Sequence, residues 1–166
     1  SSDLPYPVCV LVHVFSIVQR IFFTDVMAEA LRIAGQGTPV LIVQFLKGGI
    51  NQGYRQPIQL GQNLNWVRCD LPGCIDTPDI DERQKKSLLD LWHYTQKVVS
   101  EEKYELVVLD ELSLAINFDL ISENEVLDFL EKRPRNLEVI LTGPNMPEVI
   151  LEMADQITEI RRSHRP

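Results

Sequence analysis

Residues 104–112, YELVVLDEL, carry the pattern on which the fold class depends. The four apolar residues from Leu106 to Leu109 form a run of strand length without alternating polar positions. Such a strand is buried on both faces, as in a parallel sheet that helices cover on either side. Asp110 and Glu111 follow at its carboxyl end, which is where sheets of this kind bind ligands. The stretch therefore predicts an α/β fold and the edge of the sheet at which a site should lie.

The rest of the chain alternates strand-length and helix-length segments. Further apolar runs of strand length lie at 7–14, 38–46, 64–70, 137–143 and 156–162. Helical patterns lie between them at 24–35, 77–102, 122–133 and 147–155. This order predicts a single α/β domain over residues 1–166, with three α/β/α layers around a mostly parallel sheet.

Composition excludes several classes of protein. The chain has 166 residues, 45% hydrophobic and 24% charged, which argues against wholesale disorder. Its net charge of −8 argues against a nucleic-acid partner, because phosphate neutralisation needs a basic face. No apolar run has the length of a membrane span, and the N-terminal SSDLPYP does not resemble a signal peptide, so a cytoplasmic protein that does not bind membranes is expected.

The cysteines Cys9, Cys69 and Cys74 cannot all pair with one another, and free thiols are the first expectation. Cys69 and Cys74 flank DLPG, so a redox pair or a weak metal site is the alternative.

The acidic strand end has two interpretations. In phosphate-loop NTPases, an Asp at this position helps to hold Mg²⁺ near the phosphates. Alternatively, Asp110 caps the next helix and Glu111 is solvated. Since successive residues of a strand face opposite ways, the two carboxylates need not share one site.

The first strand-to-helix junction often carries a glycine-rich phosphate loop, but here it contains no glycine. The junction consists of Ser16, Ile17, Val18, Gln19, Arg20, Ile21, Phe22, Phe23 and Thr24. In one interpretation, Phe22 and Phe23 begin the first helix and pack onto the sheet, with Ser16 as the N-cap. In the other, this apolar surface contacts a second copy or a protein partner. In both, apolar side chains fill the place of a phosphate cradle.

Several motifs together resemble the bacterial ATP:corrinoid adenosyltransferases. The segments are LRIAGQGTPVLIVQFLKGGINQG (31–53) and the chain from YELVVLDELS through VILTGP to ADQITEI (104–160). The resemblance implies a phosphate-loop NTPase (RecA-like) fold and a homodimer. It also implies transfer of the 5′-deoxyadenosyl group of ATP to a Co(I) corrinoid, with release of triphosphate. The cobalt is then the nucleophile, so no catalytic side-chain nucleophile is expected.

The resemblance also implies where the ligands ATP, Mg²⁺ and corrinoid would lie. Lys47, Asn51 and Thr142 correspond to positions around the nucleotide or corrinoid, and Asp110 and Glu111 to the Mg²⁺ position.

The family loop T-G-(N/D)-G-K-G-K-T-T falls on residues 16–24, where the chain departs from it. Ile17, Gln19 and Ile21 replace the glycines, Phe22 replaces the essential lysine and Phe23 the Mg²⁺-binding hydroxyl. Glycines let consecutive N–H groups converge on phosphate, and the lysine neutralises it. Losing the lysine and one loop donor should weaken triphosphate binding by roughly 3–6 kcal/mol, or about two to four decades.

Other departures agree with this one. Ile50 stands at a Trp position, Tyr54 at an acidic one, Ser113 ends the altered DELN motif, and Pro144 replaces an Arg. The sequence therefore predicts a homologue without the phosphate loop, a pseudoenzyme that binds a small molecule or a protein. An active transferase using Arg20 and Lys47 in a rearranged site is the alternative, and corrinoid binding without ATP is a third possibility.

Overall fold

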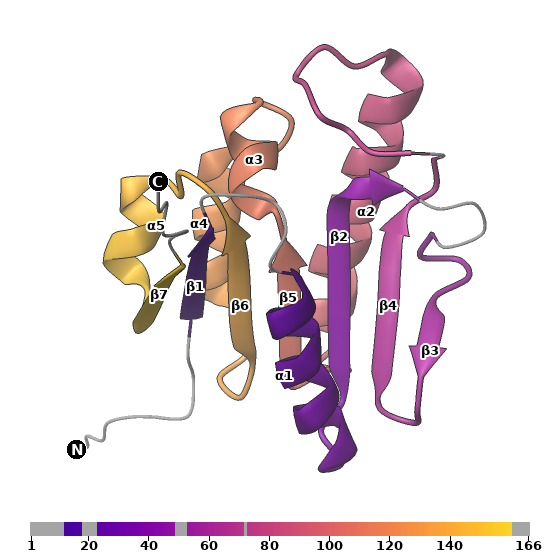
Figure 1. Ribbon diagram of the computed structural model, residues 1–166, viewed down its shortest axis with the longest axis vertical. Coiled ribbons are helices and arrows are strands. Elements are labelled where there is room, and N and C mark those ends of the chain that lie inside the picture. The colour runs from indigo at the N-terminus through magenta and orange to yellow at the C-terminus, as the bar shows by residue number, and fades with distance from the viewer. Residues whose placement is uncertain (1–11, 18–22, 49–52, 72, 161–166) are drawn as a thin grey trace, which may run out of the picture.

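The computed structural model describes residues 12–17, 23–48, 53–71 and 73–160. Its strands are β1 (Val12–Ile17), β2 (Val40–Gly48), β3 (Ile58–Leu60), β4 (Leu64–Cys69), β5 (Leu106–Asp110), β6 (Glu138–Gly143) and β7 (Gln156–Ile160). Its helices are α1 (Phe23–Gly35), α2 (Glu82–Ser100), α3 (Leu112–Asn117), α4 (Glu123–Lys132) and α5 (Glu148–Met153). The strands form one seven-stranded sheet in the order β3-β4-β2-β5-β6-β1-β7 (Figure 1). Every neighbouring pair is parallel except β3 with β4.

Helices cover both faces of this sheet, which confirms the predicted three-layer α/β/α fold. Helix α1 lies in front of the sheet in Figure 1, and α2 to α5 lie behind it. On α1, Val26, Ala30 and Ala34 recur every four residues and pack against the even-numbered side chains of β2, such as Val40 and Ile42. The odd-numbered side chains of β2 face the other core, so the strand is buried on both sides, as its continuous apolar run predicts.

Local capping explains where two of the helices begin. At the start of α2, Asp81 accepts a hydrogen bond from the Gln84 N–H, and the Gln84 side chain accepts one from the Asp81 N–H. At the start of α4, the Ser122 side chain accepts a hydrogen bond from the Glu125 N–H at 3.4 Å. These caps satisfy N–H groups that have no partner within a helix.

The first strand and helix differ from the expectation. Strand β1 continues to Ile17, beyond the predicted end at residue 14, and Ser16 pairs in the sheet beside Gly143. Ser16 is therefore not an N-cap, and that part of the interpretation is wrong. Helix α1 begins at Phe23, while residues 18–22 of the junction lie outside the described part of the chain.

Two short elements were not predicted. Strand β3 has three residues and helix α3 has six, lengths at which hydrophobic periodicity gives little signal. In the part of the chain that the structure describes, no helix is long and apolar enough to cross a bilayer.

Candidate functional site at the carboxyl ends of the strands

Four polar side chains form a row across four neighbouring strands, one beside the next. Arg68 on β4, Gln44 on β2 and Asp110 on β5 are partners in the strand register, and Thr142 on β6 follows. Arg68 Nε donates to Gln44 Oε1 (2.7 Å), and Gln44 Nε2 donates to Asp110 Oδ2 (3.0 Å). Thr142 Oγ1 donates to Asp110 Oδ1 (2.9 Å). We call these four residues the polar row. It lies at the carboxyl-terminal boundary of the layer of apolar side chains that the preceding strand residues form.

The members of the polar row are held in place from both ends. Trp66 Nε1 donates to Gln44 Oε1 (2.8 Å), so this amide oxygen accepts two hydrogen bonds and its orientation is fixed. At the other end, the Glu111 N–H donates to Thr142 Oγ1 (2.9 Å), which leaves the hydroxyl proton for Asp110. Gln44, Asp110 and Thr142 are each buried, and a buried network of this kind is stable only when its members are paired.

Lys47 brings a positive charge to this row. Its Nζ lies 3.8 Å from Asp110 Oδ2 and 3.9 Å from Glu111 Oε1, so one ammonium group faces both carboxylates. Glu111 can turn toward the same side as Asp110 because its backbone adopts a left-handed conformation (φ 59°) at the start of α3. The two carboxylates therefore share one site, which strand alternation alone did not require.

The charge of Asp110 is costly in this position. Burial raises the pKa of Asp110, and the negative charge of Glu111 raises it further. The charge of Lys47 and the hydrogen bonds from Gln44 and Thr142 act in the opposite direction without restoring the usual value. The neutral acid is thus favoured more strongly in the folded chain than in the unfolded chain.

The oxygen donors at this site are of the kind that Mg²⁺ prefers. Each Asp110 oxygen accepts one hydrogen bond from the protein and keeps a second lone pair, so Asp110 and Glu111 would both be able to contribute an oxygen ligand. Among the described residues, no group of three or more His, Cys, Asp or Glu could hold a metal by itself, so the remaining ligands would have to come from a phosphate group or water.

The segment after β4 folds back onto the end of β2, next to Lys47. The Gly48 N–H donates to the Gly73 carbonyl (2.7 Å), and the Ile75 N–H donates to the Leu46 carbonyl (2.7 Å). Lys47 and Cys74 form an antiparallel bridge between the two segments. The backbone around Lys47 is therefore fixed by residues 73–75.

Gly48→Ala should lower the free energy of unfolding by about 2 kcal/mol. A Cβ at Gly48 would lie 2.0 Å from the Leu71 carbonyl oxygen and 2.7 Å from that of Gly73, so backbone must move. Urea unfolding measures the loss. The matched control is Gly35→Ala at the end of α1, where a Cβ meets nothing within 4 Å and a change within about 0.5 kcal/mol is expected. Equal effects of the two substitutions would contradict the close approach.

Cys69 and Cys74 are both free thiols, so the redox-pair interpretation is not supported. Cys69 is buried, its thiol donates to the Phe45 carbonyl (2.9 Å), and Cys74 is exposed. Burial raises the pKa of Cys69 to about 12, although a hydrogen bond with Ser87 lowers it somewhat. Its thiolate fraction at pH 8 is then roughly a thousandfold below that of an ordinary cysteine.

Cys69 should accordingly resist thiol reagents in the folded protein. In a folded Cys74→Ser variant at pH 8, we expect Cys69 to react with Ellman's reagent roughly a thousandfold more slowly than in the same variant unfolded in urea. Mass spectrometry of the peptide 69–83 follows the labelling. Because the pKa is raised by folding, ionisation of Cys69 opposes folding, so its contribution lowers stability as the pH rises toward 12. Equal rates in the folded and unfolded chain would disprove the burial of Cys69.

The structure brings together most of the described residues predicted for the site. Lys47, Asp110, Glu111 and Thr142 meet in one cluster. Glu111 is buried rather than solvated, and the N-cap of α3 is Glu111 rather than Asp110, so both parts of the alternative interpretation are wrong. Asn51 lies outside the described residues, as do residues 18–22 of the altered junction.

Sequence reasoning did not assign Gln44, Arg68 or Trp66 to the site. Gln44 was detectable in principle, because it is a single amide within an otherwise apolar strand. Such a residue needs a buried partner. Arg68 and Trp66 become site residues only through the register that aligns β4 with β2.

The parallel sheet, its helical layers and the acidic end of β5 define a protein with a fold of the phosphate-loop NTPase type. The family model for the ATP:corrinoid adenosyltransferases BtuR/CobO/CobP matches residues 24–166. The chain therefore belongs to this family. The match begins at Thr24, so the residues that replace the phosphate-loop glycines and lysine precede the matched stretch.

Individual relatives agree with this assignment. A corrinoid adenosyltransferase of Sinorhizobium sp is 30% identical over 147 residues, which cover 81% of this chain and 64% of that protein. A corrinoid adenosyltransferase of Escherichia coli (strain K12) is 29% identical over 140 residues, which cover 83% of this chain and 69% of that protein. A corrinoid adenosyltransferase of Pseudomonas aeruginosa is 27% identical over 139 residues, which cover 78% of this chain and 64% of that protein. The chain thus spans about two thirds of the length of these relatives.

Proposed function

We propose that this chain is a corrinoid adenosyltransferase homologue that has lost the phosphate loop and acts as a non-catalytic binding or regulatory protein. It acts in the cytoplasm, as a homodimer. The observation that carries the proposal is the sequence of residues 16–24, in which Ile17, Gln19, Ile21 and Phe22 replace the glycines and the lysine of the family loop.

The physical reason lies in what a triphosphate needs. Converging backbone N–H groups and a lysine hold its charge, and β-branched residues resist the left-handed conformations that such a loop requires. The acidic cluster of Asp110 and Glu111 can favour a cation but not a free polyphosphate. The polar row and Lys47 are then a scaffold for binding rather than the remainder of a complete triphosphate site.

An adenosyltransferase assay tests this proposal. With Mg-ATP and a Co(I) corrinoid, we expect turnover at least about a hundredfold below that of the Escherichia coli relative assayed in parallel, in line with the weaker triphosphate binding. Circular dichroism establishes that the chain is folded under the assay conditions. Comparable turnover by the two proteins would refute the non-catalytic function.

A second candidate is an active adenosyltransferase with a rearranged site. The position of Lys47 favours it, because its ammonium group already lies at the acidic strand ends, 3.8 Å from Asp110 Oδ2. In that case Lys47 and Arg20 would bind the triphosphate, and Lys47→Ala and Arg20→Ala would each abolish turnover. Turnover that both variants retain would eliminate this candidate.

A further inference from the structure

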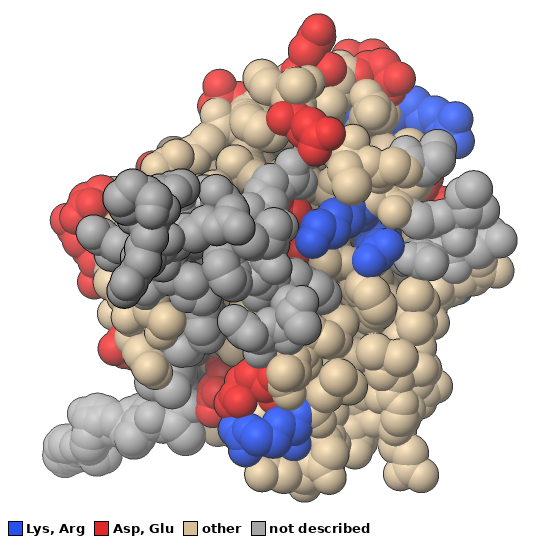
Figure 2. Space-filling model, viewed as in Figure 1, with Lys and Arg blue, Asp and Glu red and all other residues tan. Residues whose placement is uncertain are grey.

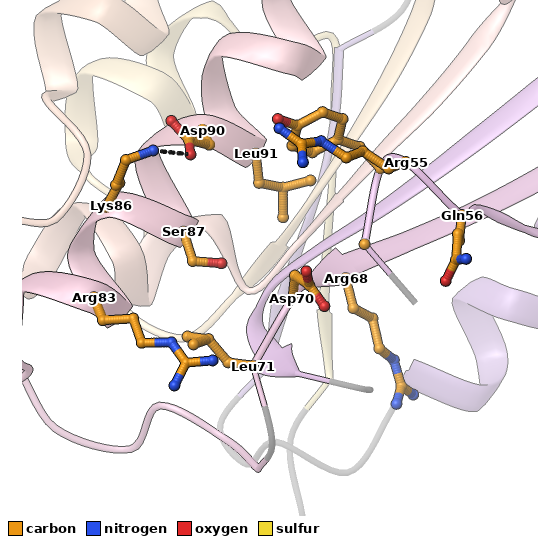
Figure 3. Close-up of a pocket in the computed structure, with 12 residues that line it drawn as sticks. Arg55, Gln56, Arg68, Asp70, Leu71, Arg83, Lys86, Ser87, Asp90 and Leu91 are labelled. Atoms are coloured by element: carbon orange, nitrogen blue, oxygen red, sulfur yellow. Dashed lines mark hydrogen bonds and ion pairs between the residues drawn. The ribbon is translucent and has the colours of Figure 1, made fainter. Parts of the chain in front are cut away.

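The charged side chains on the described surface do not converge on a second site. A hollow of about 590 Å³ lies between the turn at residues 53–56 and the first half of α2, but the guanidinium groups of Arg55, Arg68 and Arg83 lie at separate edges of it (Figure 3). Among the described residues on the face in Figure 2, acidic and basic side chains are interspersed. The contact between α3 and the segment after β6 is more specific, because it joins two departures from the family motifs.

Three hydrogen bonds attach α3 and the residue before it to the segment that ends β6 and leads to α5. Each is donated from the α3 side and accepted on the β6 side: Glu111 N–H to Thr142 Oγ1 (2.9 Å), Ser113 Oγ to the Pro144 carbonyl (2.6 Å) and Asn117 Nδ2 to the Asn145 carbonyl (3.0 Å). We call these three bonds the latch. Donors and acceptors follow one another in chain order, so the latch holds the two segments side by side.

The middle bond of the latch depends on a close approach to Gly143. A Cβ at residue 143 would overlap with Ser113 Oγ, and the φ of Gly143 is 137°, a conformation that other residues rarely adopt. Ser113 is buried, and a buried hydroxyl needs a partner, which here is the Pro144 carbonyl. The glycine thus leaves the space that the serine side chain fills.

Ser113 and Pro144 are two of the positions at which the chain departs from the family motifs. Ser113 stands where the motif DELN has asparagine, and Pro144 stands where the motif T-G-R has arginine. The 2.6 Å hydrogen bond brings the two departures into contact. Proline also fixes the backbone φ at residue 144, which restricts the segment that carries the accepting carbonyl. The two substitutions therefore belong to one local arrangement.

The latch surrounds a backbone conformation that glutamate rarely adopts. The φ of Glu111 is 59°, and left-handed residues also follow α3 at Asp119 (59°) and lie in the opposing segment at Asn145 (51°). Such conformations cost free energy and persist only where the surrounding contacts fix them. Glu111 forms no side-chain capping bond, so its N–H bond and the bond of Ser113 are the contacts of the latch that act on it.

We propose that Ser113 is a positioning residue that acts through Glu111. By fixing the first turn of α3 to the Pro144 carbonyl, it keeps Glu111 Oε1 beside Lys47 Nζ, 3.9 Å away. Two carboxyl groups then face one ammonium group, a balance that favours a cation over an anion. With Glu111 turned away, Lys47 would face Asp110 alone. The inference does not depend on the proposed function, because it concerns this cluster and not residues 16–24.

NMR of the Lys47 ammonium nitrogen tests the proposal in the whole chain. The Glu111→Gln variant defines the signal of Lys47 without the second carboxylate, and Lys47→Arg assigns that signal. In Ser113→Ala, which removes only the hydroxyl, we expect the signal to move toward its position in Glu111→Gln, because Glu111 is released from Lys47. In the double variant, Ser113→Ala should cause no further shift, since no charge remains for it to position.

Hydrogen exchange of the Glu111 N–H is the second measurement. Loss of the Ser113 hydroxyl should speed this exchange about tenfold, which corresponds to the loss of one hydrogen bond. Ser100→Ala is the matched control, because Ser100 Oγ donates to the Lys97 carbonyl at the same length of 2.6 Å but on the exposed end of α2. Neither the Lys47 signal nor the exchange at Glu111 should change in this control.

Asn117→Ala keeps the proposal open to disproof even if Ser113→Ala does not fold. It removes an exposed side chain at the far end of the latch and should shift the Lys47 signal in the same direction by a smaller amount. A Lys47 signal that stays in place in the folded variants would overturn the proposal. An equal shift on adding Ser113→Ala to Glu111→Gln would also overturn it, because Ser113 would then act without Glu111.

Discussion

Restoring the phosphate loop should raise the affinity of the chain for Mg-ATP by about two to four orders of magnitude. The variant carries Ile17→Gly, Gln19→Gly, Ile21→Gly, Phe22→Lys and Phe23→Thr. The three glycines allow the backbone N–H groups to converge, the lysine neutralises the phosphates, and the threonine returns a hydroxyl for Mg²⁺. The acidic strand end that this loop would face, with Asp110 and Glu111, is already formed.

The control for this experiment separates the effect of the loop's backbone geometry from the effect of the lysine charge. A variant with the three glycines but with Phe22 retained lacks the lysine and should recover only part of the affinity. Calorimetry of each variant with Mg-ATP measures the gain. If the fully restored variant binds no better than the natural chain, the replaced residues are not the reason for weak binding, and the central proposal loses its physical basis.

Asp110→Ala should lower the free energy of unfolding by about 3 kcal/mol. The carboxylate accepts hydrogen bonds from Gln44 and Thr142, which are both buried and would lose this acceptor. Asp128→Ala is the matched control, because it removes an exposed carboxylate that pairs with Lys132 at 2.8 Å on the surface of α4. A loss within about 0.5 kcal/mol is expected there. Urea unfolding of both variants measures the difference, and equal losses would disprove the role of the polar row.

The Asp110→Asn variant distinguishes the hydrogen bonds of Asp110 from its charge. Folding raises the pKa of Asp110, so the folded chain binds a proton more tightly than the unfolded chain. The contribution of this group to stability therefore falls as the pH rises from the usual Asp pKa to the raised value. Asn keeps an oxygen acceptor without the charge, so the loss should be smaller than with Ala and this pH dependence should disappear. A steeper dependence in the variant would contradict the direction of the pKa shift.

The regular elements follow from the sequence because their signals are local. Continuous apolar runs identify β2, β5 and β6, and helical patterns identify α2 and α4. Burial on both faces then leads to the three-layer fold. Helix α3 was not predicted, because the side chain of its N-cap, Glu111, forms no capping hydrogen bond.

The site was predictable only in part, because its geometry depends on long-range register. Asp110, Lys47 and Thr142 could be assigned from the resemblance, each at the end of a strand. The pairing of Arg68 with Gln44 arises from the alignment of β4 with β2, which no local signal encodes. The left-handed backbone of Glu111 is rare for a glutamate, and it brings the second carboxylate toward Lys47.

The most direct test of the account is a calorimetric titration of the natural chain with Mg-ATP. The sequence of residues 16–24 leads us to expect no saturable binding up to about 1 mM ATP. Binding at micromolar concentrations, lost in a Lys47→Ala variant, would contradict the account and establish a rearranged triphosphate site.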